Sequence, residues 1–159
     1  MIAKQLDHIA FRVTDIDPVV SYYTKKLGYK VVQEMELDFG GTKAVSNVLN
    51  LPGTKFYIFV DQGLDWDNII TRWVKKNGSK MHHMAYCVDD IYDAAEEMRK
   101  HGVEFTSKDV VDTGGGLKQL FTLPSPVTGM ITELIQRERD DIFFVQGNVI
   151  ELIRSTEGL

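Results

Sequence analysis

The chain is poor in cysteine and contains no long apolar segment. It has a single cysteine, Cys87, so no disulfide can form within the chain, and a reducing, cytoplasmic location is expected. No apolar run approaches the roughly 18 residues that a transmembrane helix requires, and the N-terminus lacks a basic stretch followed by an apolar one. The sequence therefore predicts neither a membrane-spanning helix nor a signal peptide.

Basic residues are not in excess either. The formal net charge is −5 and lysine and arginine form no extended run, which argues against a surface for nucleic acid or anionic membrane. The three glycines at 114–116 lack the G-x-G-x-x-G spacing of a nucleotide-binding turn, so they predict only a loop.

An internal repeat organises what is present. QLDHIAFRVTDI (residues 5–16) and KMHHMAYCVDDI (residues 80–91) superpose without a gap after a shift of 75 residues, which places His8 on His83. Each copy alternates as a strand does and ends at an acidic turn into an amphipathic run that stops at a glycine. The sequence therefore predicts two similar halves, each opening with a strand that presents one histidine.

The element order predicts an α+β fold with two βαβββ modules. We expect a single domain over residues 1–159. Its predicted parts are a first module at 1–62, a connector helix at 63–79, a second module at 80–137, and a tail with a short helix at 138–159. The connector helix is expected over residues 65–77 with an aspartate cap, and residues 103–111 are expected to be weakly extended.

Two histidines and one glutamate are the candidate metal ligands. His8 and His83 occupy equivalent repeat positions, and Glu133 lies in the last strand on the same face as Ile131 and Ile135. A carboxylate among apolar neighbours is costly unless it is paired or binds a metal. A lone strand histidine is more often a core residue, but the matched repeat positions outweigh that interpretation. The set is that of a non-haem Fe(II) facial triad.

The other two histidines have different expected roles. His82 points to the opposite face of its strand from His83, so a supporting or structural role is expected. His101 stands in the last turn of a predicted helix beside Gly102, where it would cap the helix.

The motifs LDHIAF, HHMAYCVDDI and ITELIQR resemble the first, fifth and eighth strands of the vicinal oxygen chelate superfamily, and the resemblance covers nearly the whole chain. That superfamily includes glyoxalase I, methylmalonyl-CoA epimerase, extradiol dioxygenases, bleomycin-resistance proteins and 4-hydroxyphenylpyruvate dioxygenase. The resemblance implies paired βαβββ modules whose mixed sheet curls around a central metal, and a homodimer.

The C-terminal third is similar to the catalytic half of 4-hydroxyphenylpyruvate dioxygenase-type enzymes through LKQLFT, ELIQR and FFVQGNVIELIRSTE. This implies an Fe(II)-dependent dioxygenase that uses O2 to decarboxylate a 2-oxo acid and oxidise the same molecule. His8, His83 and Glu133 would bind the iron. The residues that would line the substrate pocket are Ser46, Asp61, Gln119, Phe121, Phe144 and Asn148. Ile131 and Val149 replace aromatic residues of that family, which suits a smaller or aliphatic substrate.

Two other interpretations stay open. HHMAYCVDDI also resembles methylmalonyl-CoA epimerase, and both that enzyme and glyoxalase I use four protein ligands, one of them from the fourth strand. Here that strand, KFYIFVDQ, offers no strong ligand at the equivalent depth, and the third strand, AVSNVLNL, offers no carboxylate base. The ion would then be Co, Ni, Mn or Zn rather than Fe(II). A metal-free, drug-sequestering protein is the third possibility.

Overall fold

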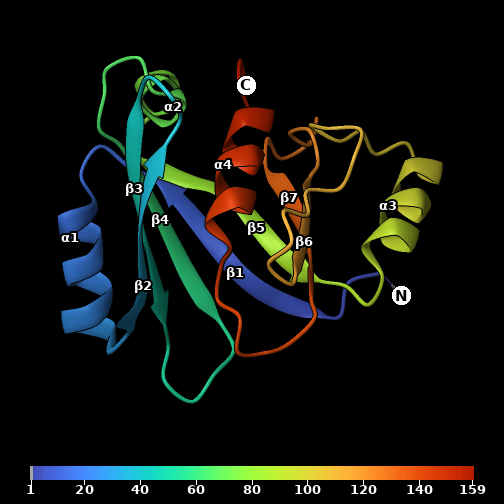
Figure 1. Cartoon of the computed structure of the whole chain (residues 1–159), viewed down its shortest axis with the longest axis horizontal. Helices are drawn as coiled ribbons and strands as arrows, with labels where there is room; N and C mark the ends of the chain where they lie inside the picture. The colour runs from blue at the N-terminus through green and yellow to red at the C-terminus, as the bar shows by residue number, and fades with distance from the viewer. Residues whose placement is uncertain (1) are drawn as a thin grey trace. The chain divides into compact units, whose positions relative to one another are not determined.

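The computed structural model describes residues 2–159, and the chain forms two compact units. The N-terminal unit comprises His8–His82 and Glu157–Leu159, and the C-terminal unit comprises the chain up to Asp7 and His83–Thr156. Within each unit, neighbouring strands pair both in parallel and antiparallel, as in a mixed sheet (Figure 1). The predicted fold class, an α+β fold with a mixed sheet, is confirmed. Within residues 2–159, no helix has the length and apolar character needed to cross a membrane.

In the N-terminal unit, helices and strands build a sheet with two different faces. Its elements are β1 (Gln5–Arg12, which begins in the other unit), α1 (Ile16–Ser21), the π-helical turn η1 (Tyr22–Lys26), β2 (Lys30–Asp38), β3 (Lys43–Asn50), β4 (Tyr57–Gly63) and α2 (Ile69–Asn77). β1 runs parallel to β4, and β2, β3 and β4 are antiparallel. One face packs on α1, where Ile16 meets Leu49, Ile58 and Val60. The alternate residues form the opposite face, to which His8 belongs.

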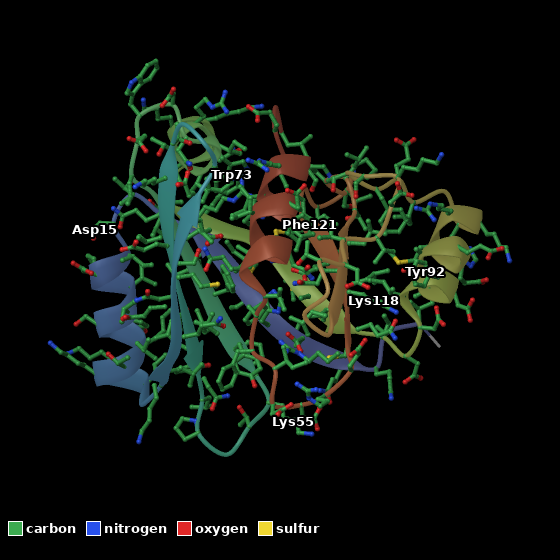
Figure 2. The ribbon with its side chains drawn as sticks, viewed as in Figure 1. Asp15, Lys55, Trp73, Tyr92, Lys118 and Phe121 are labelled. Atoms are coloured by element: carbon green, nitrogen blue, oxygen red, sulfur yellow. The ribbon has the colours of Figure 1, made fainter. Side chains whose placement is uncertain are left out.

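The C-terminal unit has the same arrangement with one strand fewer. Its elements are β5 (Lys80–Cys87, which begins in the other unit), α3 (Ile91–Lys100), β6 (Leu117–Phe121), β7 (Ile131–Arg137) and α4 (Gln146–Ser155). β5 is parallel to β7, and β6 is antiparallel to it. On one face, α3 buries its apolar side against Leu120 and Leu134, and Lys118 Nζ lies 5.4 Å from the Tyr92 ring (Figure 2). α4 packs beside β6, where Leu152 contacts Phe121.

The duplication extends to individual hydrogen bonds. Asp15 and Asp90, 75 residues apart, cap α1 and α3 by accepting from backbone N–H groups of the first turn (Figure 2 labels Asp15). A glutamine side chain supports each helix start: Gln62 Oε1 accepts from Ile16 N at 2.8 Å, and Gln136 Oε1 accepts from Ile91 N at 2.9 Å. Each unit therefore ties its helix to its sheet in the same way.

Two sequence-based expectations about elements were wrong in detail. The connector helix begins at Ile69 rather than near residue 65, because the Asn68 side chain accepts from Ile70 N and caps it. Asp65 instead accepts a hydrogen bond from Lys43 N. The segment 103–111 forms no strand and contributes only isolated bridges at Phe105 and Val111, because a turn closed by the Ser107 hydroxyl interrupts it.

A buried ion pair in the C-terminal unit connects segments that are far apart in the sequence. Arg137, at the end of β7, donates to both carboxylate oxygens of Asp7 at 2.7 and 3.1 Å. It also donates to the carbonyls of Ile142 and Phe143, and its guanidinium lies 5.1 Å from the Phe144 ring. The Asp7 and Arg137 side chains are only 2% and 9% exposed. Arg137 therefore holds the N-terminal segment and the segment that leads into α4.

We predict that Arg137→Met lowers the free energy of unfolding by about 3 kcal/mol, because it leaves a buried carboxylate uncompensated. The measurement is urea denaturation followed by circular dichroism. Arg139→Met is the matched control, since the Arg139–Asp141 pair is exposed on both sides and should contribute little. Equal effects of the two substitutions would show that the buried pair does not stabilise the unit.

Candidate metal centre

His8 belongs to the face of the N-terminal unit that is opposite α1. It is 1% exposed, it lies beside Tyr57 in the β1–β4 register, and its ring is 6.3 Å from that of Phe59. Aromatic side chains of β4 therefore lie near the imidazole. Farther along the two strands, Ala10 pairs with Phe59 and Arg12 pairs with Asp61.

Asp61 is a buried carboxyl group on this same face. It lies opposite Ser46 in the β3–β4 register and accepts a hydrogen bond from the Ser46 hydroxyl. Burial raises the pKa of Asp61 to about 6, although the hydrogen bond from Ser46 and the charges of Arg12 and His8 oppose the shift. Asp61 can therefore exchange a proton near neutral pH.

Arg12 is a charged residue of this face that the sequence reasoning missed. It is 1% exposed, and its guanidinium lies 5.7 Å from the ring of Trp73 on α2 (Figure 2 labels Trp73). Burial lowers its pKa to about 10, so it stays cationic at neutral pH beside Asp61. The period-2 spacing of residues 8, 10 and 12 was the signal that could have placed it on the face of His8.

In the C-terminal unit, His83 and Glu133 form a buried pair. His83 Nε2 lies 2.9 Å from Glu133 Oε2, and the two side chains are 9% and 1% exposed. Gln119 Nε2 donates to the other carboxylate oxygen, Oε1, at 2.8 Å. Phe121 is next to Glu133 in the β6–β7 register, and its ring is 4.6 Å from that of His83. One oxygen of Glu133 is therefore held by an amide, while the other faces an imidazole nitrogen.

His8, in the N-terminal unit, and His83 and Glu133, in the C-terminal unit, each offer one atom that could bind a metal ion. All three residues are buried. Neighbouring ligands of a six-coordinate ion, each about 2.0–2.2 Å from the metal, lie roughly 3 Å apart. The distance of 2.9 Å between His83 Nε2 and Glu133 Oε2 fits that spacing. The donor set and its burial therefore suit a divalent metal.

The internal repeat identifies the residue of the N-terminal unit that is equivalent to Glu133 and could have supplied a fourth metal ligand. Ala85 pairs with Glu133 in the C-terminal unit, and the equivalent Ala10 pairs with Phe59 in the N-terminal unit. The position that corresponds to Glu133 thus carries an aromatic ring without a donor atom. The expectation that the fourth strand offers no strong ligand at this depth agrees with the register.

The other predicted site residues fall into two hydrogen-bonded pairs and one separate contact. Ser46 pairs with Asp61, and Gln119 pairs with Asn148, whose Nδ2 donates to Gln119 Oε1 at 3.0 Å. Phe144 lies under the Arg137 guanidinium. Whether these residues contact a substrate stays a prediction.

The remaining histidines and the cysteine have structural surroundings. His82 is buried with its ring 5.1 Å from that of Trp73, and His101 is the C-cap residue of α3 and lies 3.3 Å from Glu97. Burial and the nearby Asp7 raise the pKa of the Cys87 thiol to about 12. Cys87 therefore stays protonated at neutral pH and is a poor nucleophile.

The chain belongs to the Glyoxalase/Bleomycin resistance protein/Dioxygenase superfamily, whose family model matches residues 7–121. Mitochondrial methylmalonyl-CoA epimerase from Homo sapiens is 29% identical over 133 residues, which are 83% of this chain and 73% of the relative.

Solved structures share the fold. Methylmalonyl-CoA epimerase from Mycobacterium tuberculosis superposes with a TM-score of 0.72 at 24% identity, over 86% of this chain and 89% of that one. A mutant of 4-hydroxymandelate synthase from Streptomyces coelicolor superposes with a TM-score of 0.85 at 19% identity, over 98% of this chain and 54% of that one.

We predict that Glu133→Ala abolishes stoichiometric metal binding while the fold is retained, because the triad loses its carboxylate ligand. The metal content is measured after loading with Co²⁺ and desalting, alongside a circular dichroism spectrum. The control is Glu138→Ala, which removes an exposed carboxylate just beyond β7. Retention of one equivalent of metal by Glu133→Ala would show that the triad is not the metal site.

Proposed function

We propose that the protein is a divalent-metal isomerase that transfers a proton at the carbon next to the carbonyl of an acyl thioester, as a methylmalonyl-CoA epimerase does. The observation that carries this proposal is Asp61, a buried carboxyl group with a pKa of about 6 on the same sheet face as His8. A general base is most effective when its pKa lies near the working pH. The epimerase relatives support the same chemistry.

In this proposal, different residues bind the metal, accept the proton and orient the base. His8, His83 and Glu133 would hold the ion, which when bound polarises the substrate's oxygen atoms and acidifies the adjacent C–H bond. Asp61, in its ionised form, accepts that proton, and the electron pair remains on the substrate as an enolate. A proton from solvent then adds to the opposite face of the planar enolate and inverts the carbon centre, and Asp61 releases the proton that it accepted to solvent. The Ser46 hydroxyl stabilises the ionised form of Asp61 and orients it.

The first test is exchange of the α-hydrogen of methylmalonyl-CoA in D2O, followed by NMR with Co²⁺-loaded protein. We expect kcat/KM to rise as the pH increases through about 6, because Asp61 must lose its proton before it can accept one. Asp61→Asn should reduce exchange by at least about 100-fold, within the range typical of general bases.

The control for this test is Ser46→Ala, which keeps the carboxyl group and should shift the pH profile to higher pH while activity remains. Exchange at the wild-type rate by Asp61→Asn would exclude Asp61 as the base. An absence of exchange at every pH, in protein that holds one metal, would exclude the isomerase.

A second candidate is an Fe(II)-dependent dioxygenase acting on a 2-oxo acid. It is favoured by the superposition on the 4-hydroxymandelate synthase mutant over 98% of the chain, and by Phe59 at the position equivalent to Glu133. Three protein ligands leave positions open for a chelating substrate and for oxygen.

Its test is oxygen uptake by Fe(II)-loaded protein across aromatic and aliphatic 2-oxo acids. If this candidate is correct, oxygen uptake coupled to carbon dioxide release is expected with at least one of them. No uptake with any of the acids would remove it, and metal-dependent exchange of methylmalonyl-CoA would favour the isomerase directly.

A further inference from the structure

We propose that Asn148, on α4, is a positioning residue for the metal centre: it orients the Gln119 amide, which in turn holds one oxygen of Glu133 so that a metal would bind the other. The inference rests on the proposed metal site but not on which reaction the site performs. It assigns Asn148 and Gln119 a role different from the pocket lining that the resemblance implies.

Backbone groups fix the orientation of the Asn148 side chain. Its Oδ1 accepts from the backbone N–H of Thr113 at 2.9 Å, and its Nδ2 donates to the backbone carbonyl of Leu117 at 2.9 Å. A backbone N–H can only donate and a carbonyl can only accept, so the amide of Asn148 has one allowed orientation. The Thr113 hydroxyl adds a second donor to Oδ1 at 2.6 Å.

The orientation of Asn148 then determines that of Gln119. The remaining Nδ2 proton of Asn148 points at Gln119 Oε1 at 3.0 Å, so Gln119 must present its Nε2 to Glu133, where it donates at 2.8 Å. Asn148, Gln119 and Glu133 are each at most 1% exposed, so water does not compete for these bonds. A flipped Gln119 would place its carbonyl oxygen against the Glu133 carboxylate and its NH2 group against the Asn148 NH2 group, and would leave buried groups unpaired.

As a result, the two oxygens of the Glu133 carboxylate have different roles. Gln119 occupies Oε1 of Glu133, whereas Oε2 lies 2.9 Å from His83 Nε2 and is the oxygen that a metal would share with that imidazole. Partners that orient a ligand from behind typically change metal affinity by about 10–100-fold when they are removed. Metal affinity should therefore depend on Asn148, although it offers no ligand atom itself.

The experiment is a titration with Mn²⁺, in which the free ion is measured by electron paramagnetic resonance, on the full chain. We expect Gln119→Leu and Asn148→Ala each to weaken binding by about 10–100-fold. Asn148→Asp keeps the size of the side chain but cannot donate a hydrogen bond to Leu117 or Gln119. It should therefore weaken Mn²⁺ binding at least as much as Asn148→Ala does. The control is Glu151→Gln, an exposed change on the same helix, which should bind Mn²⁺ as the wild type does.

A double-mutant cycle separates a positioning role from simple loosening of α4. If Asn148 acts through Gln119, the double variant Gln119→Leu/Asn148→Ala binds Mn²⁺ no more weakly than Gln119→Leu alone. Additive losses, or unchanged affinity in both Asn148 variants, would overturn the proposal. If the wild-type protein binds no Mn²⁺ or Co²⁺, the proposed metal function fails first.

Discussion

The buried carboxylate of Glu133 is the constraint on which the C-terminal unit depends. A charge that is 1% exposed among apolar side chains is tolerated only when it is paired and hydrogen-bonded. Here His83 faces one oxygen and Gln119 donates to the other. Gln119 is in turn held by Asn148, so the placement of α4 and the charge in the sheet are linked. The residues that satisfy this charge are also those that would orient a metal ligand.

The candidate site combines a duplicated scaffold with a difference between the two units at one ligand position. Asp15 and Asp90, with Gln62 and Gln136, fasten each helix to its sheet by the same bonds in both units. His8 and His83 preserve the symmetry of the repeat. Glu133 breaks it, because the equivalent residue is Phe59. The duplicated scaffold thus carries one candidate metal ligand in the N-terminal unit and two in the C-terminal unit, and Phe59 offers no donor atom at the position equivalent to Glu133.

The sequence predicted those parts of the molecule that depend on short periods and on the repeat. Alternation within strands placed His8, His83 and Glu133 on inward faces, and the shift of 75 residues revealed the two related halves. The network of Asn148 with Gln119 and Thr113 was out of reach, because it joins residues 29 and 35 positions apart whose contact depends on how α4 packs. The pairing of Arg12 with Asp61 required the parallel register of β1 and β4, which the sequence pattern does not specify.

Asp61 in the N-terminal unit and Glu133 in the C-terminal unit are buried carboxyl groups with different surroundings, and this difference bears on the proposed proton transfer. Glu133 accepts a hydrogen bond from a fixed amide at one oxygen and faces an imidazole at the other, which suits a metal ligand. Asp61 has lost solvent, and the Ser46 hydroxyl and nearby cations restore only part of the lost stabilisation, so its pKa rises to about 6. Under the proposed function, these surroundings suit Glu133 to the role of metal ligand and Asp61 to that of proton acceptor. A dioxygenase that acts on a 2-oxo acid would need Glu133 as a metal ligand, but its reaction would not require Asp61 as a proton acceptor.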